Sequence, residues 1–445
     1  MQFTKIMIAV AALAAGSSSF AAPASGKVAI SAGASAIRNN FFLNTGLGAS
    51  ALKARCVGTY TVLGAGNFRS AICSNTAVTN ANYAALATSS FVDFTGLGVS
   101  EVRINTEGSF SAVLLLNSAA AFAQNSTGIN GANPAVWDPA ANAASTIYPA
   151  GAKIVGGFID VEPLAFPAST IGLNRIFPST AAGFAQTFGV IASLPLYTKM
   201  FSAQQASGFI PVACSVGDTG IASCVPSIGK SQMTSIMAGN EFGAAYASGV
   251  GFLTRVAGDS GIELRYARRV DNSGTQAAAQ NYFLGLPCSG TSAVAVVAEP
   301  TSNDEAGGLK DKLLSAIRVM AAPGTGDVLN EANSATNFVV GVVSGENNQT
   351  GQTWRWLRMQ GAPIGENAQP SSPGITNADK SYALGLYDFG YETVYSGGSV
   401  VGNNFFAAVT ATVNTLVASV GLIDNATVAA GFSRNGNSCQ FPTTN

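Results

Sequence analysis

The segment 268–275 concentrates the anion-binding residue types of this 445-residue chain. It reads Arg-Arg-Val-Asp-Asn-Ser-Gly-Thr. Arg269 carries a permanent positive charge and a planar fork of donors, and each charge-assisted hydrogen bond contributes about 1.5–3 kcal/mol. Ser273 and Thr275 add hydroxyl donors, and Gly274 lets an anion approach the backbone closely. The segment therefore predicts a binding site for a phosphate-like oxyanion.

Two elements are expected to position these residues. Residues 262–267 alternate apolar and polar side chains, which is typical of a half-buried strand, and the Ala-rich run 276–283 has high helix propensity. A helix that begins near Ser273 points the free backbone N–H groups of its first turn, and the positive end of its dipole, at a ligand. The alternative for this turn is an ordinary Ser/Thr helix cap with Asp271 in the turn.

The segment 269–275 resembles the ligand loop of the phosphate-binding proteins of bacterial ABC phosphate transporters. That loop reads Arg-x-Asp-Gly-Ser-Gly-Thr before a helix, and this chain has Asn272 in the place of the first glycine. Other segments similar to the family follow in the same order: 31–35, 60–66, 92–94 with 100–101, and 226–239. The resemblance covers most of the chain, but only the loop is specific.

The resemblance implies a set of oxyanion-binding residues and no metal, cofactor or catalytic residue. The ligand-binding residues are Ser35, Glu101, Arg269, Ser273, Gly274 and Thr275. Ala65 stands where the family has a serine, so the hydroxyl of that serine is missing here. Asn67 is the residue that could substitute for it. Glu101 stands in the place of an aspartate that accepts the proton of a protonated phosphate, and a carboxylate there disfavours a fully ionised ligand. If Glu101 does not reach the site, sulfate or an organic phosphate becomes an alternative to inorganic phosphate.

The resemblance also implies an α/β fold of the type 2 periplasmic-binding-protein class, with two lobes, a hinge and an inter-lobe cleft. A mature chain of about 420 residues exceeds one ordinary domain. The expected division is a signal peptide at 1–21, the first part of lobe one at 22–108, lobe two at 109–348 and the return segment of lobe one at 349–445. Ser35 and Glu101 then face the 269–275 loop across the cleft, where two-lobed binders hold their ligands.

Several segments carry expectations about local structure. The strand-like run 188–193 precedes a helix at 199–205, and this alternation by itself indicates α/β lobes. Two further strands are expected at 337–343 and 354–359, and a further helix at 226–239. Residues 125–152 are rich in Asn, Gly, Pro and Ala, so a long surface loop is expected there. The charged run 303–312, which holds Glu305 and Asp311, is expected to be a solvated helix start.

Composition indicates an exported protein. Residues 1–21 hold Lys5, an apolar run and a small-residue end, as in a secretory signal, so the mature protein is expected in the periplasm or outside the cell. Removal of Lys5 changes the net charge from −1 to −2, so the mature chain is near neutral. A chain without excess positive charge is not expected to bind nucleic acid. The apolar run 406–422 is interrupted by polar residues, so no membrane span is expected in the mature chain.

Six cysteines after a signal sequence indicate disulfides. Sequence alone does not fix the pairing. Proximity along the chain suggests disulfides between Cys56 and Cys73 and between Cys214 and Cys224. Cys288 and Cys439 are then left to form the third pair. Free buried thiols are the alternative.

The absence of histidine argues against an enzyme. It excludes Ser-His-Asp and Cys-His catalysis and removes the commonest zinc ligand. Gly229-Lys230-Ser231 mimics the end of a P-loop, but Cys224 stands where that motif needs a glycine. We therefore expect a solute-binding protein with an ABC transporter permease as candidate partner. The alternative is a secreted or surface structural protein that keeps the fold without a transport role.

Overall fold

The computed structural model describes a defined part of the chain. The described residues are 23, 26–34, 51–112, 115, 134–159, 161, 179–239, 248–285, 297–305, 308–345, 347–359, 361, 391–397, 422–424, 432–433 and 443–444. The expected signal peptide, residues 406–421 of the apolar run, Ser35, Cys288 and Cys439 lie outside them. Among the described residues, no helix has both the length and the apolar character needed to cross a membrane.

We call residues 26–112 and 134–159 the N-terminal region. Its main strands are β1 Val28–Ala32, β2 Thr59–Ala65, β3 Phe68–Ser74, β4 Glu101–Asn105 and β7 Lys153–Ile159. They follow the order β7-β1-β4-β3-β2, in which β1 runs parallel to both β4 and β7. Side chains alternate along β4, so Val102 and Ile104 enter the apolar core while Glu101 and Arg103 point to the other face. Short 3-10 helices lie at Lys53–Arg55, Tyr83–Ala85 and Thr88–Ser90.

Two features of the N-terminal region differ from the sequence expectation. Part of the expected surface loop at 125–152 forms a hairpin, made by β5 Val136–Asp138 and β6 Ala143–Ser145. Strand β7 hydrogen-bonds to β1, although the sequence assigned its residues to lobe two. Strand pairing therefore joins segments from both sides of the boundary expected at 108, and the lobe boundaries remain a prediction.

We call residues 188–285 and 297–359 the central region. Its strands are β10 Leu264–Arg269, β11 Lys310–Leu314, β12 Ile317–Ala322, β13 Phe338–Ser344 and β14 Trp354–Trp356. Strand β10 lies between β12 and β13 and is parallel to both, and β11 closes the edge in the antiparallel sense. Two short parallel strands, β9 Ser227–Ile228 and β15 Arg358–Met359, pair beside this sheet.

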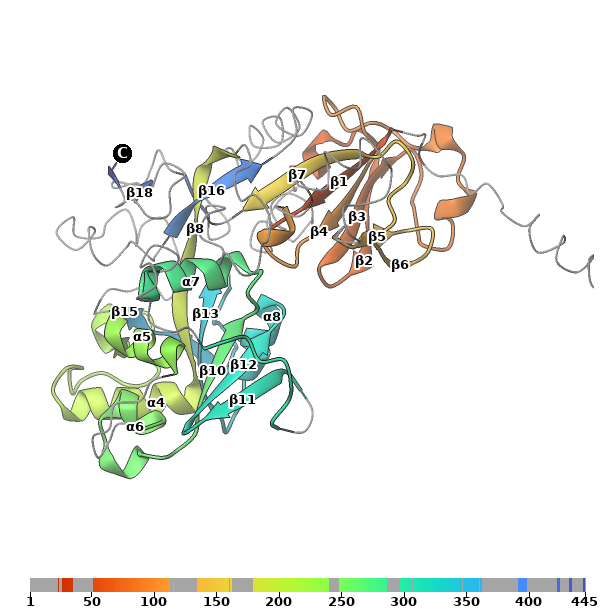
Figure 1. Cartoon of the computed structure of the whole chain (residues 1–445). Helices are drawn as coiled ribbons and strands as arrows, with labels where there is room; N and C mark the ends of the chain where they lie inside the picture. The colour runs from red at the N-terminus through yellow and green to blue at the C-terminus, as the bar shows by residue number, and fades with distance from the viewer. Residues whose placement is uncertain are drawn as a thin grey trace, which may run out of the picture.

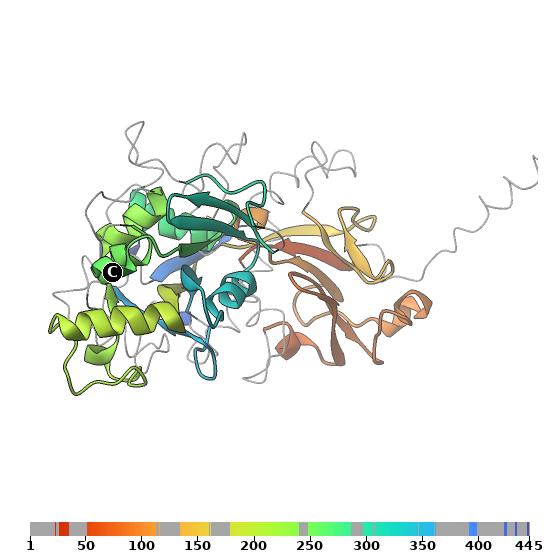
Figure 2. The same ribbon diagram turned by 90° about the horizontal axis from the view of Figure 1, so that it is seen from below.

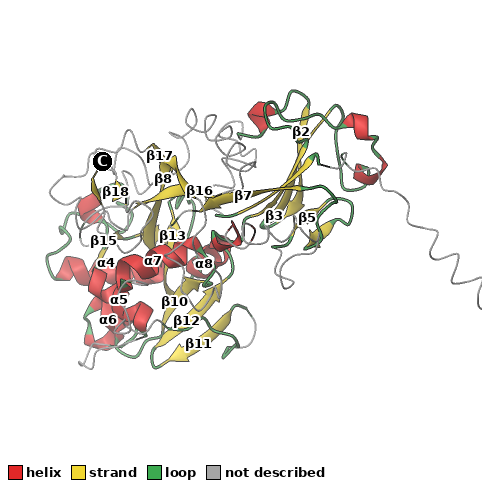
Figure 3. Ribbon diagram, turned by 45° about the horizontal axis from the view of Figure 1, so that its top comes forward, coloured by secondary structure: helices red, strands yellow, loops and turns green. Residues whose placement is uncertain are grey.

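Helices cover both faces of the central sheet. One face packs against α4 Leu194–Ala206, α5 Lys230–Ala238, α6 Val250–Thr254 and α7 Gly274–Leu284, and the other packs against α8 Thr325–Ala332 (Figures 1 and 3). The alternation along β13 explains this: Val340 and Val342 join the α4–α7 core, whereas Val339 and Val343 join the α8 core. Two 3-10 helices, Ala222–Cys224 and Ala257–Asp259, complete the region. The described fold is thus mixed α/β.

Long strands connect the two regions. In β8 Ser179–Ser193, the first half pairs with β16 Tyr391–Gly397 and the second half pairs with β13. Strand β16 in turn pairs with β7, so hydrogen-bonded strands run from the central region into the N-terminal region (Figure 2). The remaining described strands are β17 Leu422–Asp424, which pairs with β8, and β18 Phe432–Ser433 with β19 Thr443–Thr444.

Most local expectations for the central region are confirmed. The expected strands at 188–193, 262–267 and 337–343 match β8, β10 and β13, and the expected helices at 199–205, 226–239 and 276–283 match α4, α5 and α7. The expected strand at 354–359 is split into β14 and β15. The disulfides Cys56 to Cys73 and Cys214 to Cys224 are present as expected.

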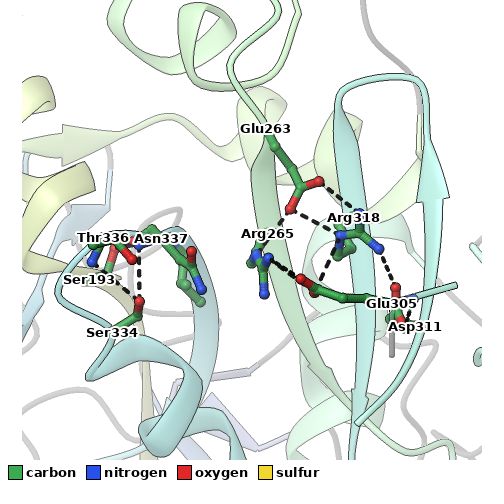
Figure 4. A network of polar contacts seen from close by, with 10 residues as sticks. Ser193, Glu263, Arg265, Glu305, Asp311, Arg318, Ser334, Thr336 and Asn337 are labelled. Atoms are coloured by element: carbon green, nitrogen blue, oxygen red, sulfur yellow. Dashed lines mark hydrogen bonds and ion pairs between the residues drawn. The ribbon is translucent and has the colours of Figure 1, made fainter. Parts of the chain in front are cut away.

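The expectation of a solvated helix start at 303–312 is wrong. Residues Lys310–Leu314 form an edge strand, and Asp311 is only 1% exposed. Its carboxylate accepts a hydrogen bond from Arg318 Nη1 at 2.5 Å, within a network that also holds Glu263, Arg265 and Glu305 (Figure 4). Glu305 and Asp311 of this run form ion pairs with residues of neighbouring strands, so the run follows no helical period. Local sequence does not reveal such pairs.

Candidate functional site

The site begins where β10 ends and α7 starts. Ser273 is the N-cap residue of α7, and its side chain makes no capping hydrogen bond. The first N–H groups of a helix have no intrahelical acceptor, so those of Gly274, Thr275 and Gln276 stay available to a ligand together with the positive end of the dipole. Strand, turn and helix therefore follow each other as the sequence predicted.

Arg269 is the last residue of β10 and is 2% exposed. Its Nη1 donates to Thr325 Oγ1 at 2.9 Å, and its Nη2 donates to the carbonyls of Pro323 at 3.0 Å and Glu107 at 3.3 Å. Its Nε donates to the carbonyl of Ala322 at 3.3 Å. These oxygens hold the planar guanidinium in one orientation, beside the first residue of α8, while the backbone N–H of Arg269 donates to Gln276 Oε1 of α7 at 3.2 Å.

The neighbouring Arg268 stabilises the turn itself. It is ion-paired with Asp271, and its Nη1 donates to the carbonyl of Val297 at 2.6 Å. The backbone N–H of Asp271 donates to Glu299 Oε2 at 2.7 Å. Asp271, the acidic residue of the loop, thus pairs with Arg268 inside the loop, and the guanidinium of Arg269 has other partners.

A segment of the N-terminal region packs directly onto the loop. The backbone N–H of Phe110 donates to the carbonyl of Asn272 at 3.2 Å, and Glu107 accepts from Arg269. At Gly108 the backbones are so close that an added Cβ would lie 2.7 Å from the carbonyl oxygen of Asn272. This segment follows the carboxyl end of β4, so strand ends from both regions meet at the loop, as in α/β ligand sites.

The structure does not bring Glu101 to the loop. Glu101 begins β4, and the four-residue rise to Asn105 spans about 13 Å, so Glu101 lies at the far end of the strand. Its carboxylate is fully buried and bonded to Arg103 Nε at 2.7 Å, to Ser70 Oγ at 2.8 Å and to Tyr83 OH at 2.5 Å.

In this buried cluster of the N-terminal region, one guanidinium is shared by two carboxylates. Arg103 also contacts Asp138 of the β5–β6 hairpin, with Nη1 and Oδ1 at 3.1 Å. Burial, and then the charge of Glu101, raises the pKa of Tyr83 well above its usual value. Tyr83 therefore stays protonated and donates to Glu101 at physiological pH. The cluster ties the hairpin to the sheet.

Glu107 is the acid that the sequence reasoning missed. Its Oε2 accepts from Asn105 Nδ2 at 3.0 Å, and its N–H donates to Asn105 Oδ1 at 2.8 Å, which fixes the turn after β4. The signal was present in the sequence, because Glu107 and Gly108 come three and four positions after the end of the strand-like run 99–104. The sequence interpretation placed the acid at the start of that strand instead of after its end.

The other expected contacts from the N-terminal region are described only in part. Ser35 lies outside the described residues, which stop at Ala34 on this side. The N–H of Gly33 donates to the carbonyl of Asn105 at 2.9 Å, so the carboxyl ends of β1 and β4 are adjacent. Asn67, the residue offered in place of the missing serine, accepts a hydrogen bond at its backbone carbonyl from the N–H of Thr106 at 2.9 Å. Within the described ranges, no group of three or more Cys, Asp or Glu side chains is suited to hold a metal ion.

Comparison with known proteins provides no family assignment. No family model matches the sequence, and no curated protein matches it. Among solved structures, the chain is similar to a protein from Clostridium perfringens described as a phosphate ABC transporter substrate-binding protein, solved with bound phosphate. The TM-score is 0.40 and the identity 11%, over 89% of this chain and 99% of that chain. At this level the likeness is coarse, and we base the functional proposal on the residues of this chain.

Proposed function

We propose that the protein is a solute-binding protein that holds phosphate or a related tetrahedral oxyanion at the 269–275 loop. One observation carries this proposal: the buried guanidinium of Arg269 is held in one orientation at the end of β10, four residues before the N-cap of α7, and the Ser273 side chain does not cap that helix. A fixed cation and a set of N–H donors at one helix start form an anion-binding arrangement.

The donor set is sufficient for useful affinity. Micromolar binding requires about −8 kcal/mol. Charge-assisted hydrogen bonds contribute about 1.5–3 kcal/mol each, so four or five of them, from Arg269, the hydroxyls of Ser273 and Thr275 and the N–H groups of the first turn, reach that value after the costs of ordering. Binding requires no catalytic group.

We further propose that Glu107 takes the role that the sequence assigned to Glu101. Its backbone touches Arg269, and its place directly after β4 is on the loop side of the N-terminal region. A carboxylate near the ligand disfavours a fully ionised oxyanion, because two like charges would face each other. A protonated oxyanion such as hydrogen phosphate avoids this repulsion, whereas sulfate does not. Ser35 remains a proposed contact from the same side.

The wider role in transport is part of the same proposal. The loop and the 107–110 segment belong to the two regions of the chain, so a ligand held between them favours a closed arrangement of two lobes. Two disulfides are typical of an exported protein. We propose a periplasmic or secreted binder that delivers its ligand to an ABC transporter permease.

Isothermal titration of the mature protein with phosphate, sulfate and arsenate tests the proposal. We expect phosphate and arsenate to bind and sulfate to bind more weakly. Arg269→Ala removes two or more charge-assisted bonds, so phosphate affinity should fall by at least about 100-fold. Glu107→Gln should reduce the difference in affinity between phosphate and sulfate.

A matched control separates a site effect from a general charge effect. Lys312→Ala removes one positive charge from an exposed position on β11 and should leave phosphate affinity unchanged. If no oxyanion binds, or if Arg269→Ala binds phosphate as the wild type does, the proposed function is wrong.

A further inference from the structure

Arg358, on β15, is a buried guanidinium whose hydrogen bonding is incomplete. It is 8% exposed, and its Nε donates to the carbonyl of Val225 at 2.6 Å. Its Nη2 is buried and has no acceptor among the described residues. No ion pair found in the described ranges includes Arg358. A buried charge without a counter-charge is costly, so a partner for this group is expected.

A second donor without a partner lies near Arg358. Tyr197 of α4 is fully buried, and its hydroxyl has no hydrogen-bond partner within the described part of the chain. Burial raises the pKa of Tyr197 to about 12, while the charges of Arg355 and Arg358 act against this rise. Arg358 is thus close enough to influence the phenol, and the phenol stays protonated at neutral pH. Two buried donors in one neighbourhood both need an acceptor.

The charges around these donors favour an anion as that acceptor. Arg355, Arg358 and Asp218 act electrostatically on Tyr197, which makes two positive groups and one negative group. Asp218 already accepts from the backbone N–H of Ser215 at 2.7 Å, and it is not among the groups that affect the pKa of Arg358. A water molecule would accept the hydrogen bonds but would leave the positive charge unmatched.

The aromatic ring of Phe209 covers one side of this neighbourhood. The ring centroid is 5.4 Å from Arg358 Cζ, and Phe209 is 54% exposed, so an apolar surface open to solvent lies beside the guanidinium. The segment after α4 is held by the disulfide between Cys214 and Cys224 and by Gln205 Nε2, which donates to the carbonyl of Cys214 at 3.0 Å. The aromatic surface is therefore fixed in place beside the guanidinium.

We propose that Arg358 and Tyr197 form a second anion site, which takes a small organic carboxylate. The two oxygens of a carboxylate match the two unpartnered donors, its single charge matches the single buried guanidinium, and its apolar substituent fits against Phe209. Arg358 contacts residues 209 and 225, whereas Arg269 contacts 107 and 322–325, so the two sites share no residue. The second site does not depend on the oxyanion site proposed above.

Titration of the mature protein with sodium acetate at constant ionic strength tests this site. We expect acetate to bind the wild type and to raise its thermal unfolding temperature. Tyr197→Phe removes only the hydroxyl and should weaken acetate binding about tenfold, and Arg358→Met should abolish it. Arg269→Ala should lose phosphate binding but keep acetate binding, which distinguishes failure at one site from failure at the other.

The neighbouring Arg355 provides the matched control. Its Nη1 donates to the carbonyls of Gln352 and Trp354 at 2.5 and 2.8 Å, so Arg355 acts on the site only through its charge, and Arg355→Met should weaken acetate binding less than Tyr197→Phe does. Tyr197→Phe keeps the ring in the core, so the test stands even if Arg358→Met does not fold. If acetate does not bind the wild type, or if Tyr197→Phe binds it unchanged, the two donors hold water and the proposal is wrong.

Discussion

Arg103 and Arg269 are both strand residues with 2% exposure, one in each region of the molecule, but their surroundings differ. Arg103 pairs with the carboxylates of Glu101 and Asp138. Arg269 donates to three backbone carbonyls and to the hydroxyl of Thr325, at the start of α8. Two carboxylates contact the first guanidinium, whereas carbonyl and hydroxyl oxygens orient the second.

The comparison shows how the same residue type serves structure in one place and recognition in another. A buried guanidinium paired with carboxylates has its charge matched inside the protein, and removing either partner leaves a buried charge. A guanidinium positioned by neutral acceptors beside a helix N-terminus keeps an attraction for an external anion. The two arginines also differ in their place along the strand, since Arg103 is the central residue of β4 and Arg269 is the last residue of β10.

The largest expected effect comes from breaking the buried cluster of Glu101, Arg103 and Asp138. Arg103→Met leaves Glu101 and Asp138 without their cation, so the free energy of unfolding should fall by about 3–5 kcal/mol, measured by urea denaturation. Phosphate affinity of the folded fraction should stay within about twofold, since the cluster does not touch the loop. A variant of unchanged stability that no longer binds phosphate would show that the cluster belongs to the site.

A smaller effect is expected where the N-terminal region meets the loop. Gly108→Ala places a methyl group 2.7 Å from the carbonyl oxygen of Asn272, so the backbones must separate. Overpacking of this kind costs about 1–3 kcal/mol, and phosphate affinity measured by titration should fall about tenfold. Gly258→Ala is the control, because the new methyl group has open space. Equal affinities of the two variants would mean that the 107–110 segment does not form part of the site.

The smallest effect concerns a third arginine, Arg318, which is partly exposed and paired with Asp311 and Glu263 (Figure 4). Burial alone would raise the pKa of Asp311, but the backbone N–H of Glu305 and the Arg318 guanidinium outweigh it and hold that pKa below its ordinary value. The contribution of Asp311 to the free energy of unfolding is therefore present at pH values above its ordinary pKa. It is lost as the pH falls through the lower pKa that Asp311 has in the folded protein.

Asp311→Asn tests this pH dependence. The wild type should lose about 1 kcal/mol more than the variant in free energy of unfolding as the pH falls from neutral into the acid range. Urea denaturation at several pH values measures the difference. Parallel pH profiles for the two proteins would show that the Arg318 pair contributes nothing to stability.

Sequence reasoning succeeded where structure follows from neighbours along the chain. The alternation at 262–267 predicts a strand, which is β10. The serine at 273 predicts a helix N-cap position, and the alanine-rich run after it predicts the helix, which is α7. It failed where partners come from other strands. Asp311 was assigned to a solvated helix start because its partner, Arg318, lies on the next strand.

The sequence by itself determined the 269–275 loop, because its strand, cap and helix depend on local propensity and on the anion-binding types within eight residues. Only the tertiary structure decided which acid approaches that loop. Glu101 and Glu107 are six positions apart, and the extended β4 places one in a buried ion pair and the other beside Arg269. The reason is physical: the pairing of β4 with β1 and β3 selects the end of the strand that meets the loop, and local sequence does not encode that pairing.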